Sequence, residues 1–317
     1  MNTPTTIARA VALLTLAASA STFAQPVEPT NGPRQVNPGW HALTGATVTT
    51  APGNTIDNAT IIIRNGAIID VGADADVPDG ARQWDLRGLF VTPAFVESFH
   101  TVEVPTPDAA GAHWNPMVAP QRSALDAGPI DDKHAQSLRA LGFAVANISP
   151  ETGVFRGRSA AVSLSKDDGD SSEQGVVLDG SIFHAASLDT RRGRSGYPSS
   201  QMGAIALARQ TLADTDWHAS AREMSMRNPE NAERPEDNAA LDALNDDAPI
   251  MWDVDTEVEA LRAIRLSDEF DREPIIVGSG TEFRRLDALR DSGARLIIPL
   301  TYPRQPRVEN RAERESV

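Results

Sequence analysis

The 317-residue sequence has no cysteine, which excludes disulfide bonds, thiol catalysis and a lipid-modified cysteine anchor. Lysine is scarce as well, because Lys133 and Lys166 are the only two and nearly all of the 29 basic residues are arginines. Acidic residues number 44, and the formal charge of −15 repels phosphate backbones and anionic lipid headgroups. We therefore expect neither a nucleic-acid partner nor a membrane partner.

Several fingerprints of catalysis and membrane insertion are missing too. The chain has no Gly-x-Ser-x-Gly elbow of a serine hydrolase, no Walker-type phosphate loop and no dinucleotide-binding glycine motif. After the N-terminus, no apolar run approaches the roughly 18 residues that a membrane-spanning helix needs. With 40% hydrophobic residues the chain is still long enough to bury a large core in one or two domains.

Residues 1–24 have the three parts of an export signal. Arg9 supplies the positive charge, an Ala- and Leu-rich apolar stretch follows, and small residues stand at Thr22 and Ala24. We expect cleavage near Ala24 and a periplasmic or secreted protein; a buried N-terminal helix is the alternative interpretation. Residues 25–40 are rich in Pro, Asn and Gly without periodicity, and we interpret them as a linker.

The rest of the chain divides by texture near residue 93. Residues 41–92 hold short β-type runs, and Asn65-Gly66 predicts a two-residue turn of a hairpin. Residues 93–317 alternate apolar strands with helical stretches, which favours parallel βαβ units, and residues 153–182 look like an antiparallel insertion. The fold class is therefore α/β, preceded by a small β domain.

The segment Asp85–Thr101 resembles the junction between β-sandwich and barrel in the amidohydrolase superfamily of metal-dependent hydrolases. The hairpin before it, and the runs Gly153–Gly157, Tyr197–Ile205 and Ile275–Glu282, are similar to an exported branch of that superfamily. The resemblance implies a composite β-sandwich segment followed by a TIM-like (β/α) barrel. It also implies a divalent metal, zinc, and hydrolysis of carbon–nitrogen bonds other than peptide bonds in a small-molecule substrate.

The ligands of such a metal are largely absent from this sequence. Aligned through Thr92-Pro93, the two positions of the superfamily's His-x-His pair fall on Phe99 and Thr101, with His100 between them. A register slip by one residue would make His100 a ligand, with Glu97 beside it on the strand. Asp253 stands at a strand end where relatives commonly place a histidine, so the candidate metal ligands are His100, Glu97 and Asp253.

Three further features leave alternatives open. Arg156, Arg158 and the arginines of 191–194 could bind an anionic substrate or pair with surface carboxylates. Gly278-Ser279-Gly280 could cradle an anion on its backbone N–H groups or form an ordinary βα turn. The resemblance ends near Leu300, which predicts an incomplete barrel that is either truncated or completed by a partner chain. We expect an amidohydrolase-related protein with weak or absent activity; the alternative is a non-catalytic periplasmic binding or assembly module that retains the barrel scaffold.

Overall fold

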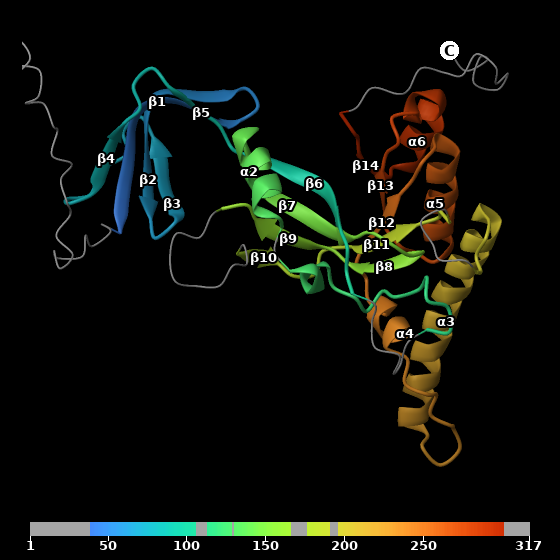
Figure 1. Cartoon of the computed structure of the whole chain (residues 1–317). Coiled ribbons are helices and arrows are strands. Elements are labelled where there is room, and N and C mark those ends of the chain that lie inside the picture. The colour runs from blue at the N-terminus through green and yellow to red at the C-terminus, as the bar shows by residue number, and fades with distance from the viewer. Residues whose placement is uncertain (1–38, 106–112, 129, 166–175, 191–195, 301–317) are drawn as a thin grey trace, which may run out of the picture. The chain divides into compact units, whose positions relative to one another are not determined.

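The structure is a computed structural model that describes residues 39–105, 113–128, 130–165, 176–190 and 196–300 (Figure 1). The expected export signal, nearly all of the expected linker, residues 191–195 and the tail after residue 300 lie outside the described residues. By its internal contacts the chain separates into two units, Met1–Pro93 and Ala94–Val317. In the described part, no helix is long and apolar enough to cross a membrane.

The first unit is one mixed sheet with strand order β3-β2-β1-β4 and with β5 on β1. Its strands are β1 (Trp40–Ala51), β2 (Asn54–Arg64), β3 (Ala67–Gly72), β4 (Arg82–Asp85) and β5 (Phe90–Val91). The predicted hairpin turn is confirmed: Asn65 and Gly66 have φ of 49° and 81°, as a two-residue turn between antiparallel strands requires. Within the described residues no second sheet faces this one, so the sandwich stays a prediction.

The second unit begins with a sheet of order β10-β9-β7-β6. Its strands are β6 (Phe95–Val102), β7 (Phe143–Pro150), β9 (Ala160–Ser163) and β10 (Val177–Asp179). Helix α2 (Asp132–Ala140) starts where the Asp131 side chain accepts a hydrogen bond from His134 N, and it buries Ala135 and Leu138. These two residues pack with Ala146 and Ile148 of β7, so α2 covers one face of this sheet.

The other sheet of the second unit has the order β14-β13-β12-β11-β8. It contains β8 (Phe155–Arg158), β11 (His184–Ser187), β12 (Ile250–Asp253), β13 (Pro274–Val277) and β14 (Arg295–Ile297). Strands β11 to β14 are parallel, while β8 is antiparallel to β11 and β9 is antiparallel to β7. Only Ser159 separates β8 from β9, so this run of chain links the two sheets. Because β9 is antiparallel to β7 and β8 is antiparallel to β11, the carboxyl ends of β7, β11 and β12 point the same way.

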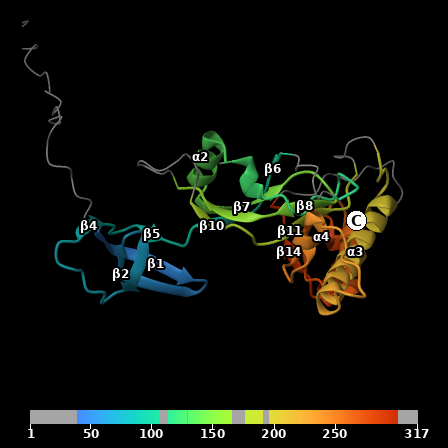
Figure 2. The ribbon, with the colours of Figure 1, turned by 90° about the horizontal axis from the view of Figure 1, so that it is seen from below.

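Helices cover the outer face of the second sheet. They are α3 (Gln201–Arg227), α4 (Ala239–Leu244), α5 (Glu257–Glu269) and α6 (Leu286–Ser292), with the short 3-10 helix η2 (Glu282–Arg285). The 3-10 helix η1 (Ala124–Ala127) lies on the other sheet, where Ala124 packs with Ala146 and Ile148 of β7. Figures 1 and 2 both show α4 beside the long α3. The main core buries Leu207 and Leu212 of α3, Ile264 of α5 and Trp252 of β12.

The expected α/β class is confirmed as a mixed α/β fold, but the described residues contain no closed barrel. At one end of each sheet, β6 pairs only with β7 and β14 only with β13 within the part of the chain that the structure describes.

Candidate functional site

The sheet of β8 and β11 to β14 has one face that is apolar midway along the strands. Phe99, the first of the two positions where the resemblance places histidines, packs on this face. Phe99 of β6 packs here with Ala185 of β11, Met251 of β12 and Ile275 of β13. Asn147 of β7 also reaches this face: its Nδ2 lies 3.7 Å from Met251 Sδ and donates to Ser98 O at 2.9 Å. We call this the inner face. The ring of Phe99 therefore fills apolar space where the resemblance places a histidine.

The next side chains along the same strands form a polar layer at the carboxyl ends. Because side chains alternate along a strand, Thr101, Ser149, Ser187 and Asp253 face the same side as Phe99, Asn147, Ala185 and Met251. Ser149 and Asn147 are buried, and among the described residues Ser149 Oγ and Asn147 Oδ1 have no hydrogen-bond partner. The region beyond the carboxyl ends of parallel strands is where α/β proteins bind ligands, so this layer is the candidate site.

An ion pair at the polar layer joins β8 to β12. Arg156 Nη1 donates to Asp253 Oδ2 at 2.9 Å, and the Arg156 side chain is 2% exposed against 22% for Asp253. Arg122 holds the backbone of β8 and of the residues before it. Its Nε donates to Arg156 O at 2.9 Å and its Nη2 donates to Thr152 O. Burial, together with the nearby charge of Arg156, lowers the pKa of Arg122. The carboxylate of Asp253, a candidate metal ligand in the sequence, is therefore paired with the guanidinium of Arg156.

Ser187 fixes the backbone at the end of β12. Its hydroxyl donates to Asp253 O at 2.9 Å and accepts from Asp189 N at 3.1 Å. The described hydrogen bonds of the polar layer therefore come from β8, β11 and β12.

His100 lies on the opposite face of β6, toward α2. Its ring stacks on His134 with centroids 4.6 Å apart, and burial, followed by the charge of His134, lowers the pKa of His100 while Glu97 opposes the shift. Glu97 Oε1 accepts from Phe99 N at 3.3 Å. The register slip that would bring His100 to the inner face is not observed, and Phe99 and Thr101 hold the inner positions.

The three candidate ligands are consequently not brought together. His100 faces α2, Glu97 holds a backbone N–H, and Asp253 pairs with Arg156. Over the described ranges, no group of three or more His, Asp or Glu side chains is arranged to hold a metal ion. The side chains present do not fit the zinc centre that the resemblance implies, because a buried cation already neutralises the one acid in the polar layer.

The Gly278-Ser279-Gly280 turn does bind an anion, but the anion belongs to the chain itself. The N–H groups of Ser279 and Gly280 donate to Oε1 and Oε2 of Glu282 at 2.6 and 2.9 Å, and Ser279 Oγ donates to Oε1 at 3.0 Å. Glu282 is buried. Of the two alternatives, the βα turn is observed, and its backbone N–H groups are taken by Glu282.

Arg156 and Arg158 each form an ion pair with a carboxylate, which is the second of the two alternatives for these arginines. Both arginine side chains are more buried than the expected surface ion pairs would require. Arg158 Nη2 bonds Asp246 Oδ2, and His184 Nε2 lies 2.9 Å from Asp246 Oδ1. Burial lowers the pKa of His184 to about 4. Burial alone would raise the pKa of Asp246, but the bonds from Arg158 and His184 lower it to about 2. His184 begins β11, so this group lies at the amino ends of the strands, where residues serve stability.

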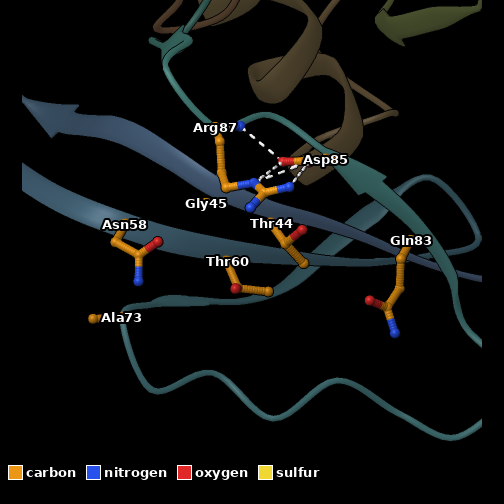
Figure 3. A pocket seen from close by; sticks show the side chains of 8 residues that line it. All are labelled: Thr44, Gly45, Asn58, Thr60, Ala73, Gln83, Asp85 and Arg87. Atoms are coloured by element: carbon orange, nitrogen blue, oxygen red, sulfur yellow. Dashed lines mark hydrogen bonds and ion pairs between the residues drawn. The ribbon is translucent and has the colours of Figure 1, made fainter.

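A polar pocket of about 470 Å³ lies on the sheet of the first unit (Figure 3). Thr44, Thr60 and Gln83 line it, and Arg87 and Asp85 point toward each other at its edge. Hydrogen bonds from Arg87 lower the pKa of Asp85 to about 2. The two charges of this pocket neutralise each other, so we do not place the functional site here.

Sequence reasoning missed several of these residues for an identifiable reason. Ser279 and Glu282 have the spacing of a capping box, a local signal that predicts their contact. By contrast, Arg156 and Asp253 are 97 residues apart, and Asn147 and Met251 are 104 apart. No local pattern contains such contacts.

No protein-family model and no curated protein sequence matches the chain. Among solved structures, an amidohydrolase from Thermotoga maritima MSB8 has 19% identity and a TM-score of 0.66, with 83% of this chain and 71% of that chain covered. A prolidase complexed with N-methylphosphonate-L-proline has 15% identity and a TM-score of 0.39, covering 82% and 66%. An N-acyl-D-glutamate deacylase from Bordetella bronchiseptica, complexed with zinc, has 13% identity and a TM-score of 0.34, covering 81% and 57%.

The likeness to the Thermotoga protein confirms the expected resemblance at the level of the fold. The other two similarities are too low to carry an argument. At these identities the fold alone is shared, so chemistry has to be argued from the side chains described above.

Proposed function

We propose that this chain is an amidohydrolase-type protein whose polar layer works as a metal-independent binding site. The fold supports descent from hydrolases of non-peptide carbon–nitrogen bonds, with a partial (β/α) barrel following a β-sandwich segment at residues 41–92. The Arg156–Asp253 ion pair carries the proposal, because it ties up the one acid of the polar layer. Hydrolysis by this chain is expected to be weak or absent.

The chemistry of the polar layer suits hydrogen bonding to a small ligand. Ser149 offers a hydroxyl and Asn147 a carbonyl oxygen, both buried on the inner face. A divalent cation would meet the guanidinium of Arg156, which repels it, and the ring of Phe99, which offers no lone pair. We therefore derive no step through a metal.

Metal analysis of the purified exported chain tests this proposal. We expect less than about 0.1 zinc per chain and a melting temperature that chelator leaves unchanged, since structural metal sites otherwise contribute folding free energy. Hydrolysis of N-acetyl amino acids and of hydantoin should stay at the uncatalysed rate with or without added zinc. One bound zinc per chain that is lost in Asp253→Asn, together with zinc-dependent hydrolysis, would overturn the proposal.

A partner chain that extends the row of strands is the second candidate. Phe95 and Val96 of β6 are exposed, as is Ile298 just after β14, and β6 and β14 are each an edge strand of their sheet in the described residues. Unpaired strand edges with apolar side chains favour pairing with another chain. Light scattering should then give a molar mass well above that of one chain, which is 33.9 kDa for all 317 residues. A monomer with a single cooperative melt contradicts this candidate.

Export completes the proposed function. Cleavage near Ala24 would place the protein in the periplasm or outside the cell, and N-terminal sequencing of the protein from that fraction tests it. Recovery of the uncleaved chain from the cell interior would contradict export.

A further inference from the structure

Two exposed aromatic rings lie together on loops that follow the carboxyl ends of β6 and β11. Trp114 lies beyond β6 and is 67% exposed, and Tyr197 lies between β11 and α3 and is 49% exposed. The ring centroids are 6.3 Å apart and the planes differ by 20°. The loops after parallel strands form the ligand-binding face of barrel enzymes, which is the face that carries the polar layer. We call the two rings the aromatic platform.

Buried polar groups hold the aromatic platform in place. Asn115 is 2% exposed; its Nδ2 donates to Tyr197 O at 3.0 Å, and its Oδ1 accepts from Met117 N at 2.9 Å. On the other side, Tyr197 Oη donates to Gly203 O at 3.0 Å in the first turn of α3. A Cβ atom on Gly203 would lie 3.3 Å from Tyr197 Cε2, so the missing side chain lets the ring approach the helix. Apolar rings kept exposed and rigid gain little for folding but are preorganised for binding.

Two described neighbours of the aromatic platform bear on its charge. The His113 ring lies 5.3 Å from that of Trp114, and burial lowers the pKa of His113, so this neighbour is neutral near pH 7. The carboxylate of Asp214 acts on His113 from α3, and the whole chain carries −15. A ring face is negative, and a negative environment strengthens its attraction for cations.

Other aromatic rings of this chain already attract cationic groups. The guanidinium of Arg64 lies 4.7 Å from the Trp40 ring centroid, and that of Arg82 lies 4.2 Å from the Trp84 ring centroid. Both pairs have the geometry of cation–π contacts, which need a distance within about 6 Å. In the described residues, Trp40 and Trp84 therefore each contact a guanidinium of the chain itself.

We propose that Trp114 and Tyr197 form a binding platform for a ligand that carries an organic cation, an ammonium or a guanidinium group. The proposal goes beyond the proposed function and does not depend on it, because a chain with zinc in its polar layer would still present these rings. Weak binding of a single cationic group is expected, since an exposed ring contributes modestly.

The five tryptophan indole N–H signals of the full ¹⁵N-labelled exported chain report on the aromatic platform directly. We titrate tetramethylammonium chloride and, separately, methylguanidinium chloride at constant ionic strength, with 2,2-dimethylpropan-1-ol as the uncharged probe. The Trp114 signal should shift with saturation, and at least one cation should bind about fivefold more tightly than the alcohol. The two salts decide between ammonium and guanidinium.

Matched variants locate the effect. Binding to the variants is read from the backbone amide signals of Asn115 and Gly203, because a Trp114 variant has no Trp114 indole signal. Trp114→Ala should abolish saturable binding, and Tyr197→Ala should weaken it about fivefold. Trp217→Ala removes a tryptophan of α3 that is similarly exposed, at 63%, and should change nothing. Trp114→Phe keeps an aromatic face and should weaken binding about threefold, which tests the proposal even if the alanine variant folds poorly.

Three outcomes would overturn the proposal. The uncharged alcohol could bind as tightly as the cations, which identifies the rings as a plain apolar surface. The Trp114 and Trp217 signals could shift together and linearly, which indicates non-specific association. Cellobiose could saturate the Trp114 signal where both cations fail, which assigns the rings to an uncharged sugar.

Discussion

Arg156 Nη1 and Asp253 Oδ2 are 2.9 Å apart, across strands that are not neighbours in the sheet: β8 and β12 lie on either side of β11. The guanidinium is almost fully buried and the carboxylate is partly open to solvent. Removing one member of such a pair leaves an uncompensated buried charge, which costs more than the pair itself contributes. The relationship makes this ion pair the part of the polar layer most sensitive to substitution.

Asp253→Asn should therefore destabilise the protein by about 2–4 kcal/mol, a buried-pair value reduced for the partly exposed carboxylate. The double variant Arg156→Met with Asp253→Leu should lose less, because it removes both charges. Urea unfolding measures the free energy, and Arg209→Met, in the exposed Arg209–Glu269 pair, is the control with a loss below about 1 kcal/mol. Equal losses in Asp253→Asn and Arg209→Met would contradict burial of the pair.

A zinc site should be recoverable if the polar layer is a metal centre without its ligands. The triple variant Phe99→His, Thr101→His, Arg156→Met places two imidazoles on the inner face of β6 and removes the guanidinium from Asp253. Because two imidazoles and a carboxylate form a common zinc site, we expect micromolar zinc binding by isothermal calorimetry. The double variant that keeps Arg156 should bind at least about tenfold more weakly, since a guanidinium repels the metal and holds its carboxylate. Equal binding by both variants would show that Arg156 is not the obstacle.

Most strands and helices of the second unit can be predicted from the local spacing of apolar residues. Apolar residues at Val258, Leu261 and Ile264 have the spacing of a helix over 257–270, which is observed as α5, ending one residue earlier. The apolar runs before and after this helix are observed as β12 and β13. Helix α3 was not predicted because its buried face consists mainly of small and polar residues, such as Ala204, Ala208 and Thr211. A stripe of that kind has little hydrophobic contrast with its exposed face.

The residues of the candidate site could be predicted from the sequence only in part. The sequence places Phe99 and Thr101 at the positions of a histidine pair, because that inference needs only an alignment through Thr92-Pro93. It could not reveal what Asp253 contacts, because its partner Arg156 is 97 residues away. Interactions between distant strands follow from tertiary register, which one sequence does not encode in any local spacing.

Stability should fall in mild acid because His184 is buried without charge. Its folded pKa of about 4 lies below the unfolded value of 6.5, so the unfolded chain binds the extra proton between these pH values. The stabilisation is complete above pH 6.5 and is lost as the pH falls toward 4, by on the order of 2 kcal/mol. Below that, Asp246 adds a further loss as the pH falls from its unfolded value of 3.8 toward about 2.

Urea midpoints measured between pH 4 and pH 7 test this expectation. His184→Gln keeps a neutral donor toward Asp246 and cannot take up a proton, so its stability should change less over this range than that of the natural chain. His100 and His113 also have lowered pKa values and account for the remaining slope. The same slope in His184→Gln as in the natural chain would contradict the assignment.

Acetate should rescue the loss of Glu282. In Glu282→Ala the N–H groups of Ser279 and Gly280 and the hydroxyl of Ser279 lose a buried carboxylate, which should cost about 2–4 kcal/mol because charge-assisted hydrogen bonds are the strong ones. A small carboxylate can enter the space that the side chain leaves and accept the same bonds. We expect the melting temperature of this variant to rise with acetate more than that of the natural chain, with chloride at equal ionic strength as the control. No difference between acetate and chloride would mean that the turn collapses around the missing side chain and does not remain an anion site.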